Sequence, residues 1–362
     1  MSGVPPPLRP ATRVPAERFQ LPVERMRDGY YSDKYFVRTR DVLLRSGRNP
    51  TVTMQVFQKQ EAMLGGVDEA IAILRSCLTA GYRWEDLEVL AVRDGDRVEP
   101  RETVMLVTGP YVAFAHLETL YLGVLARRTR VATNTRRVVE AAWPKPVMFF
   151  PARFDHWLVQ TGDGYAAHIA GAIGVSTDAQ ASWWGSSGIG TVPHALIAAF
   201  EGDTVAASRA FADTMPADVR VITLVDFDND CVGTSLAVAR ALGPRLSGVR
   251  LDTSESMVDR SVIPMMGSFD PRGVNPQLVR NVRAALDAEG FSAVQITVSG
   301  GFDPEKIRRF EAGGVPVDSY GVGSSLFSGG YDFTADIVNV NGKTVSKAGR
   351  AYRPNPRLEP VP

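Results

Sequence analysis

Apolar residues in the first 142 positions follow two periods, one typical of strands and one typical of helices. Residues 51–57 alternate polar and apolar side chains, and residues 102–108 form a second run of strand-forming residues. Residues 69–78 place apolar side chains at helical spacing, and a longer helical pattern covers residues 112–142. These patterns predict a sheet-based domain with helices between its strands.

Beyond residue 143 short apolar runs alternate with helical patterns. This alternation is typical of βα units, which build a parallel sheet. The candidate strands are residues 147–150, 189–192, 220–226, 248–252, 293–299, 317–321 and 336–340, with helices such as 276–288 and 304–312 between them.

Composition narrows the class of protein. The 362 residues carry 40 basic and 40 acidic side chains, so no global field attracts nucleic acid or an anionic membrane. No apolar run approaches the length of a bilayer span, and the N-terminus has no secretory signal pattern. Cys77 and Cys231 form no CxxC pair and are expected to be reduced core thiols of a cytoplasmic protein.

Polar and charged residues gather at the carboxyl ends of the predicted strands. In a (β/α) barrel these ends form the rim of the active site, and the last loops commonly hold a phosphate. Glycine in such loops lets backbone N–H groups approach phosphate oxygens closely. The residues at these ends are Asp226, Asp228, Arg250, Asp252, the run Ser299-Gly300-Gly301 and the turn Gly323-Ser324-Ser325.

Phosphate-binding glycines beside carboxylates indicate a phosphorylated sugar whose diphosphate is bridged by Mg²⁺, with Asp226 and Asp228 as candidate ligands. Carboxylates opposite a ribose also stabilise an oxocarbenium-like transition state. A structural alternative stays open, in which these two aspartates cap the following helix. Arg250 either pairs with Asp252 or holds an anion through two N–H groups.

His194 is the histidine with the most suggestive surroundings. A Gly-rich turn leads through Thr191 and Pro193 into an apolar helical segment that His194 begins. Thr191 is expected to cap that helix, whose free N–H groups favour a phosphate. A capped helix with an incidental histidine remains the alternative for this stretch alone. No HExxH or GxSxG motif is present.

An ordered set of motifs across residues 30–350 resembles the nicotinate phosphoribosyltransferases, which are type II phosphoribosyltransferases. One of these motifs is GTxxH, present here as Gly190-Thr-Val-Pro-His194. The other motifs are SDKYF at 32–36, LETLYLG at 117–123, VDFD at 225–228, GVRLD at 248–252, SGG at 299–301, DSYGVG at 318–323 and the closing segment at 342–350.

The resemblance implies an irregular (β/α) TIM-like barrel with a second α/β domain built from the N-terminal third and the C-terminal end. Residues 1–28 are rich in proline and arginine, a composition that predicts a flexible lead-in. The other expected boundaries are an α/β domain at 29–142, the barrel at 143–333 and a returning segment at 334–362. The implied reaction joins nicotinate to 5-phosphoribosyl 1-diphosphate (PRPP) in NAD biosynthesis, releasing diphosphate with Mg²⁺ present. ATP hydrolysis would be coupled through a phosphohistidine, and a homodimer or higher oligomer would share its active sites.

The resemblance also implies a role for individual residues. His194 stands where the family carries its phosphorylated histidine, and Tyr35 matches the aromatic that stacks on the pyridine ring, usually across a dimer interface. Arg153 matches an arginine near the pyridine substituent. The implied 5′-phosphate ligands are Ser299, Gly300, Gly301, Gly323 and Ser324, and the residues facing ribose, diphosphate and Mg²⁺ are Asp226, Asp228, Arg250 and Asp252, with Asp226 and Asp252 in catalytic roles.

Some residues depart from the family pattern and keep alternatives open. Residues 150–153 read Phe-Pro-Ala-Arg where the family often has Phe-Gly-x-Arg, and both cysteines lie too early for the C-terminal zinc module of some relatives. Quinolinate, with decarboxylation, and nicotinamide are alternative substrates. The small number of candidate arginines favours a substrate with a single carboxylate. A non-catalytic relative of the barrel is a further alternative, disfavoured by the intact motifs.

Overall fold

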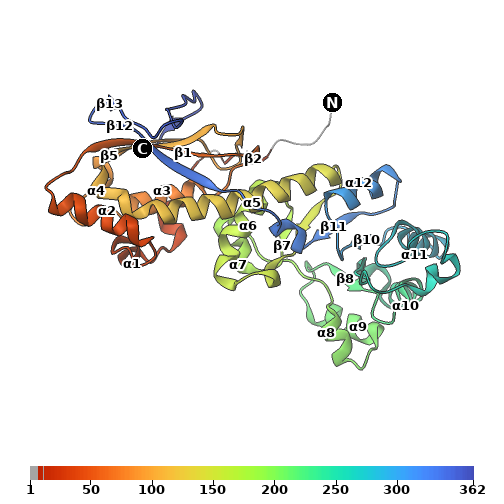
Figure 1. Ribbon diagram of the computed structural model, residues 1–362. Coiled ribbons are helices and arrows are strands. Elements are labelled where there is room, and N and C mark those ends of the chain that lie inside the picture. Colours follow the sequence, from red (N-terminus) through yellow and green to blue (C-terminus); the bar gives the residue numbers. More distant parts are fainter. Residues whose placement is uncertain (1–6, 11) are drawn as a thin grey trace. The chain divides into compact units, whose positions relative to one another are not determined.

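The computed structural model describes residues 7–10 and 12–362 (Figure 1), which form two compact units. Among the described residues, the parallel unit comprises 137–160 and 171–327, and the antiparallel unit comprises 7–10, 12–136, 161–170 and 328–362. These boundaries differ from the implied ones chiefly because residues 161–170 belong to the antiparallel unit.

The antiparallel unit is built on a six-stranded sheet of order β13-β12-β1-β5-β3-β14. β1 pairs with β5 on one side and with β12, from the end of the chain, on the other. The strands are β1 (Thr51–Gln58), β3 (Glu88–Ala91), β5 (Thr103–Pro110), β12 (Phe333–Val340), β13 (Lys343–Thr344) and β14 (Glu359–Pro360), with the separate pair β2 (Ala62–Met63) and β4 (Arg97–Val98). The helices are α1 (Val23–Arg27), α2 (Lys34–Arg45), α3 (Val67–Ser76), α4 (Tyr111–Phe114), α5 (Glu118–Ala142) and α6 (Gln160–Ile169), with short 3₁₀ turns at Ala16–Phe19, Trp84–Asp86 and Ala115–Leu117.

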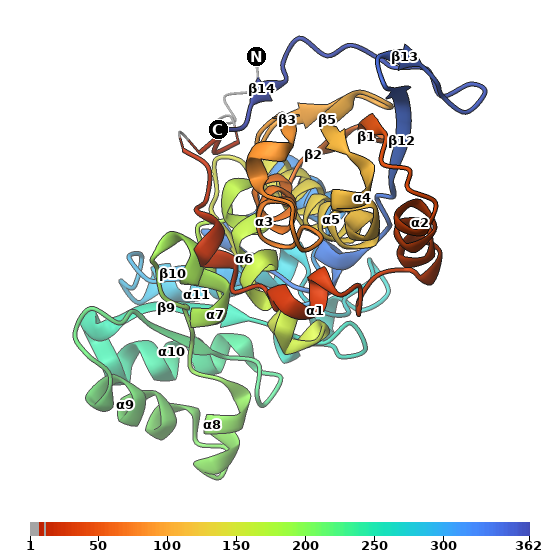
Figure 2. The ribbon, with the colours of Figure 1, turned by 90° about the vertical axis from the view of Figure 1, so that its left-hand side faces the viewer.

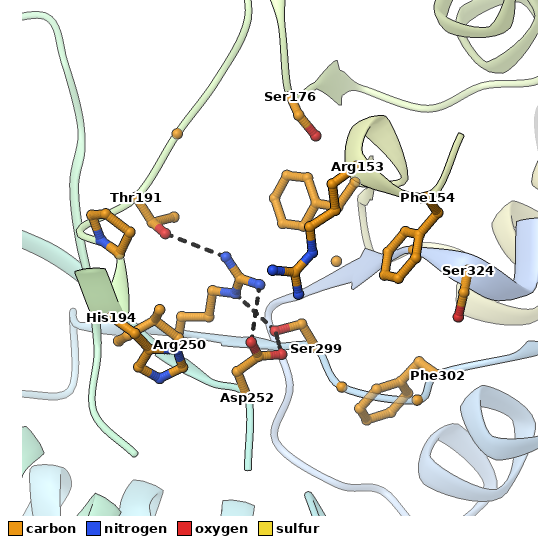
Figure 3. Close-up of a pocket in the computed structure, with 18 of the residues that line it drawn as sticks. Arg153, Phe154, Ser176, Thr191, His194, Arg250, Asp252, Ser299, Phe302 and Ser324 are labelled. Atoms are coloured by element: carbon orange, nitrogen blue, oxygen red, sulfur yellow. Dashed lines mark hydrogen bonds and ion pairs between the residues drawn. The ribbon is translucent and has the colours of Figure 1, made fainter. Parts of the chain in front are cut away.

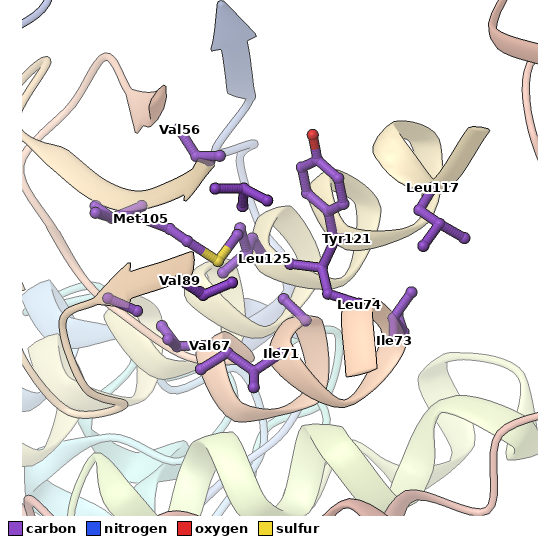
Figure 4. Packing of buried hydrophobic residues seen from close by; sticks show 14 of the residues in the cluster. Val56, Val67, Ile71, Ile73, Leu74, Val89, Met105, Leu117, Tyr121 and Leu125 are labelled. Carbon is purple, nitrogen blue, oxygen red and sulfur yellow. The ribbon is translucent and has the colours of Figure 1, made fainter. Parts of the chain in front are cut away.

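One face of this sheet packs on α3 and α5, as the view in Figure 2 and the close-up in Figure 4 show. Val56 and Met105 come from the strands, Ile71 and Leu74 from α3, and Tyr121 from α5; all are at most 5% exposed. Burial of an apolar side chain of this size contributes about 1.5–3 kcal/mol. The apolar periodicity therefore predicted the strands at 51–57 and 102–108 and the helix at 69–78 correctly.

The structure differs from the expected flexible lead-in over the residues that it describes there. Arg13 donates to the Asp68 carboxylate over 2.8 Å, and the backbone N–H of Val14 donates to the same carboxylate. Phe19 is buried, and α1 follows it. The segment from Arg13 on is therefore packed on the unit, because one long-range ion pair and one aromatic side chain hold it. Residues 1–6 and 11 of the expected lead-in lie outside the described residues.

The parallel unit is built on a six-stranded sheet of order β7-β6-β11-β10-β9-β8, in which every pairing is parallel. Helices connect the strands, as the alternating pattern predicted. The strands are β6 (Val147–Phe149), β7 (Gly174–Val175), β8 (Val221–Leu224), β9 (Leu246–Leu251), β10 (Gln295–Val298) and β11 (Ser319–Val322). The helices are α7 (Asp178–Ala181), α8 (His194–Ala199), α9 (Thr204–Thr214), α10 (Cys231–Leu242), α11 (Pro276–Ala288) and α12 (Pro304–Ala312), with 3₁₀ turns at Ala152–Phe154, Trp157–Val159, Ser182–Trp184, Gly243–Arg245, Arg260–Met265 and Ser324–Phe327.

The six strands form a half-barrel of parallel strands rather than a fully paired barrel. Residues 189–192, predicted as a strand, contribute one isolated bridge between Val192 and Thr223. Ile189 N–H donates to Val175 of edge strand β7, and Val192 N–H donates to Ile222 of edge strand β8. Pro193 ends this contact because it has no N–H to add to a ladder.

The cysteines and the hydropathy of the helices can also be seen in the structure. Cys77 and Cys231 are buried and form no disulfide, and burial raises the pKa of the Cys77 thiol to about 11. Among the described residues, none of the helices combines the length and the hydropathy needed for a bilayer span.

Candidate active site

A cavity of about 750 Å³ opens at the carboxyl ends of the parallel strands (Figure 3). Each of five strands, β6, β7, β9, β10 and β11, is followed directly by a residue that lines the cavity. Ligands bind at this edge in parallel α/β sheets. The polar and charged lining residues are Arg153, Ser176, Thr191, His194, Arg250, Asp252, Ser299, Asp303, Ser324 and Ser325, and the aromatic ones are Phe150, Phe154 and Phe302.

Arg250, Asp252 and Ser299 form one hydrogen-bonded cluster in this cavity. Arg250 Nε donates to Ser299 Oγ over 2.8 Å, and Ser299 Oγ donates to Asp252 Oδ1 over 2.7 Å. Arg250 Nη2 lies 3.5 Å from Asp252 Oδ2. The cluster fixes the carboxylate beside a guanidinium while both remain partly exposed to the cavity.

Two guanidinium groups share this space. Arg250 lies over the Phe150 ring, with its Cζ 5.0 Å from the ring centroid. Figure 3 shows the guanidinium of Arg153 directed toward the guanidinium of Arg250. Burial lowers the pKa of Arg250, and the positive charge of Arg153 lowers it further. Two cations that repel each other in a cavity favour the binding of an anion.

His194 is the first residue of α8, and its Nε2 is hydrogen-bonded to Asp226 Oδ1 at 2.9 Å. The imidazole is 42% exposed, whereas the Asp226 side chain is 7% exposed. The hydrogen bond to Asp226 raises the pKa of His194, with smaller contributions from the charges of Asp226 and Asp252. When the ring is neutral and Asp226 is ionised, Nε2 carries the single proton and Nδ1 keeps its lone pair.

The expected cap of this helix is wrong. The residue before α8 is Pro193, and it makes no side-chain cap hydrogen bond. Thr191 lies too far ahead of the helix and instead accepts a hydrogen bond from Arg250 Nη1 at 3.4 Å. Thr191 therefore belongs to the arginine cluster, which no local pattern in the sequence indicates.

The loop after β10 requires its two glycines. Gly300 and Gly301 have φ values of +84° and +66°, in the region that favours glycine. A Cβ at Gly301 would lie 1.9 Å from Glu255 Oε1, so this flexible side chain would have to move, and the positive φ is the stronger requirement for glycine. The loop therefore keeps the open backbone that phosphate contacts need.

Sequence reasoning missed two charged residues beside this loop. Lys306, in the first turn of α12, donates from Nζ to the Gly300 carbonyl over 3.2 Å and lies 4.4 Å from the Phe302 ring centroid. Burial lowers the pKa of Lys306, whereas the charge of Glu255 raises it. The signal available was the helix start Asp303-Pro304, which brings Lys306 back over the loop.

The cavity gathers most of the predicted site residues. The residues that line it are Arg153, His194, Arg250, Asp252, Ser299, Gly300, Gly301, Gly323 and Ser324. Asp226 is not among the lining residues but reaches His194 through their hydrogen bond.

Two predicted residues are not brought into the cavity. Asp228 is exposed and does not line it. Tyr35 is 60% exposed on α2, in the antiparallel unit. The alternative that Asp226 or Asp228 caps the next helix is also wrong, because Asp230 caps α10.

No cluster of three or more His, Cys, Asp or Glu side chains suited to a metal occurs among the described residues. A complete metal cage from protein ligands is therefore not formed in this part of the chain. The donors present, Asp226 and Asp252, fit Mg²⁺ that is held mainly by substrate oxygens and water, as this ion commonly is.

Comparison with known proteins gives similarity over most of the chain. Residues 33–129 match the family described as quinolinate phosphoribosyl transferase, N-terminal domain. A nicotinate phosphoribosyltransferase of Mycobacterium tuberculosis is 32% identical over 73% of this chain and 56% of its own length, and a second one from that organism is 30% identical over 68% and 49%. The chain thus spans about half the length of the curated relatives that it matches.

Solved structures agree with this similarity. A nicotinate-nucleotide pyrophosphorylase from Pyrococcus furiosus is 32% identical, with a TM-score of 0.80 over 94% of this chain and 84% of that protein. Human nicotinic acid phosphoribosyltransferase shares the fold, with a TM-score of 0.65 at 18% identity, over 88% of this chain and 77% of the human one.

Proposed function

This chain belongs to the nicotinate phosphoribosyltransferase family of type II phosphoribosyltransferases, and we propose that it joins nicotinate to PRPP in NAD biosynthesis. The products would be nicotinate mononucleotide and diphosphate. The observation that carries the proposal is the cavity in which the Arg250–Asp252–Ser299 cluster, a glycine loop and a second guanidinium converge.

We propose that the two loops after β10 and β11 hold the 5′-phosphate of PRPP. Backbone N–H groups in loops of this kind bind phosphate oxygens, and both loops line the cavity. Lys306 adds a positive charge behind the first loop through its bond to the Gly300 carbonyl. The proposed ligands are Ser299, Gly300, Gly301, Gly323 and Ser324.

In the proposed reaction the bond between C1′ and the diphosphate oxygen breaks, and a bond forms between C1′ and the pyridine nitrogen. Asp252 and Asp226 would stabilise the positive charge that develops on the ribose. Arg250 would bind the departing diphosphate through charge-assisted hydrogen bonds. Asp226 and Asp252 are the carboxylates that would hold Mg²⁺, which would supply positive charge beside the diphosphate. Asp228, the other predicted ligand, does not line the cavity.

We propose that Nδ1 of the neutral His194 ring attacks the γ-phosphorus of ATP, which breaks the bond to the β-phosphate oxygen and releases ADP. Hydrolysis of the phosphohistidine then releases phosphate and restores the imidazole. The hydrogen bond between Nε2 and Asp226 supports this, since it leaves the Nδ1 lone pair available for attack. In this role the histidine couples ATP to the reaction and does not itself break the C1′–O bond. His194→Ala is therefore expected to abolish stimulation by ATP and to retain slow transfer. Complete loss of basal transfer in a folded variant would contradict this role.

Nicotinate is favoured over quinolinate by the cations of the cavity. Among the described residues that line it, the only Arg or Lys side chains are Arg153 and Arg250, and the proposed reaction uses Arg250 for the diphosphate. One guanidinium suits one carboxylate, whereas quinolinate carries two. Nicotinamide has no carboxylate for Arg153 to bind.

The decisive experiment supplies purified protein with PRPP, Mg²⁺ and one pyridine at a time, with and without ATP, and separates the nucleotides by chromatography. Nicotinate mononucleotide is expected from nicotinate alone. Product from quinolinate with release of CO₂ would replace the proposed substrate. Absence of product from all three pyridines would refute the enzyme proposal.

A homodimer with shared sites is proposed because Tyr35 is exposed on the antiparallel unit and absent from the cavity lining. A second copy would supply this ring to stack on nicotinate. Tyr35→Ala and Asp252→Asn are each expected to be nearly inactive. When the two variants exchange subunits, about a quarter of the activity should return, since each mixed dimer regains one intact site. No recovery despite subunit exchange would show that each chain forms its site alone.

A further inference from the structure

A small cavity with basic walls lies on the antiparallel unit, built from residues with no role in the proposed reaction. Its volume is about 130 Å³. The residues that line it come from β1, from the turn before β5 and from the segment that follows β13. They are Gln55, Phe57, Lys59, Arg101, Gly349, Arg350, Ala351 and Arg353.

Four of these eight residues are cations, and none of the described residues that line the cavity is acidic. Arg350 has one carboxylate partner outside the lining, Asp336, at 3.4 Å. Arg350 also lies over the buried Phe57 ring, with its Cζ 5.5 Å from the ring centroid. One carboxylate leaves an excess of positive charge around the cavity, which an anion would offset.

The backbone that carries Arg350 and Arg353 is fixed by a buried glutamine. Gln55 is 3% exposed, and its Nε2 donates to the carbonyls of Arg350 and Ala351 at 3.4 and 3.2 Å. Gln55 Oε1 accepts from the Arg353 backbone N–H, and Thr103 Oγ1 donates to the Arg353 carbonyl over 2.6 Å. Figure 2 shows this returning segment beside the sheet, between β13 and β14. The walls are therefore held in place before any ligand binds.

Arg101 stands in a backbone conformation that arginine rarely adopts. Its φ is +66°, and its N–H donates to the Gln58 carbonyl over 2.7 Å. A non-glycine residue in this region costs about 1 kcal/mol or more. Glycine would be the better residue for the turn itself, so the arginine side chain at this position has a reason beyond local folding.

We infer that this cavity, lined by Lys59, Arg101, Arg350 and Arg353, binds a tetrahedral oxyanion of the size of inorganic phosphate. The volume accommodates a few water molecules or one such ion. It lies below the ~300–1,000 Å³ of pockets that enclose larger ligands, which excludes a whole nucleotide. Guanidinium groups suit phosphate because they donate two parallel hydrogen bonds.

The test counts bound phosphate per chain by equilibrium dialysis with labelled orthophosphate, in the absence of substrates. The variant is Arg101→Gly together with Arg353→Gln, since glycine accepts the positive φ of Arg101 and glutamine keeps much of the length of Arg353. The variant is expected to bind one phosphate fewer per chain, or to bind it at least about tenfold more weakly. The matched control, Lys347→Ala, removes an exposed cation of the same segment that does not line the cavity, and should bind as the wild type does.

Equal number and affinity of sites in the double variant and the wild type would overturn the inference. Circular dichroism and melting establish that each variant is folded. If the double variant unfolds, the single variant Arg353→Gln is tested instead. It is expected to bind phosphate about tenfold more weakly, and an unchanged affinity would overturn the inference. Phosphate bound in the proposed active site is counted separately by repeating the dialysis with Arg250→Met, which leaves the basic cavity intact.

Discussion

Two clusters of arginine and carboxylate occur in this chain, one closed and one open. In the antiparallel unit, Arg128 contacts Asp163 at 2.7 Å and Glu69 at 2.9 Å, and Arg127 contacts the other oxygen of Asp163 at 2.7 Å. In the parallel unit, Arg250 and Asp252 are 3.5 Å apart and border the large cavity. The same two residue types thus stand in opposite surroundings.

The closed cluster is buried at its centre, around Asp163 and Arg128, whereas Arg127 at its edge is 23% exposed. The Asp163 side chain is 1% exposed, and the Arg128 guanidinium lies so close to Gly162 that a Cβ there would be 2.1 Å from Cζ. The side chains of Arg250 and Asp252 are 19% and 22% exposed. A cluster whose central carboxylate is buried between two guanidinium groups stabilises the fold, whereas one that borders a cavity remains accessible to a ligand.

The largest expected effect follows from opening the closed cluster. Asp163→Ala would leave Arg127 and Arg128 without their shared carboxylate in a buried place, which costs about 3–5 kcal/mol of unfolding free energy. Urea unfolding measures this loss. The control Asp213→Ala removes an exposed partner of Arg245 and should cost less than about 1 kcal/mol. Equal unfolding free energies of the two variants would mean that the closed cluster does not stabilise the fold more than an exposed ion pair does.

The complementary change in the open cluster should affect turnover rather than folding. Asp252→Asn removes a negative charge that faces the ribose in the proposed reaction, and should lower kcat/KM for PRPP about 10²–10³-fold. Unfolding free energy should change by less than about 1 kcal/mol, and nicotinate affinity should change little. Comparable losses in turnover and in nicotinate binding would assign Asp252 a structural role.

Local patterns in the sequence predicted the elements and the edge where the site lies. The alternation at residues 51–57 and the helical spacing at 69–78 reappear as β1 and α3. The strand-end residues Arg250, Asp252 and Ser299 lie together because parallel strands present their carboxyl ends at one edge. These features depend on the hydrophobic period of each segment and on the direction of the strands, and both can be inferred from a single sequence.

Contacts between distant residues could not be predicted in this way. The bond of Thr191 to Arg250 spans 59 positions, and it replaced the expected helix cap. The contact of Lys306 with Gly300 spans only six positions, and it was missed because it depends on the helix start at Asp303-Pro304 rather than on the spacing of a motif. The placement of Arg13 on Asp68 likewise depends on the folded surface of α3, so a proline-rich composition misled the prediction of a flexible segment.

Two histidines, one in each unit, should make the stability of the protein depend on pH. The buried His116 should have the larger effect. His116 is fully buried in the antiparallel unit, and burial lowers its pKa to about 4. The folded state then favours the neutral ring, so this contribution to stability is present above pH 6.5 and is lost as pH falls toward 4. At pH 5 the loss should be about 2 kcal/mol. Urea unfolding at pH 7.5 and pH 5 measures it, and His116→Leu should remove this part of the pH dependence.

His194, in the open cluster, should show a smaller effect of opposite sign. Its hydrogen bond to Asp226 raises its pKa, so the folded state favours imidazolium. This contribution to stability is present below pH 6.5 and is lost as pH rises through the folded pKa. Because the ring is 42% exposed, less than about 1 kcal/mol is expected. Titration of His194 by NMR should show a lower midpoint in Asp226→Asn than in the wild type. An unchanged midpoint would mean that Asp226 does not control the proton on His194. Nδ1 would then not be favoured over Nε2 as the atom that accepts the phosphoryl group.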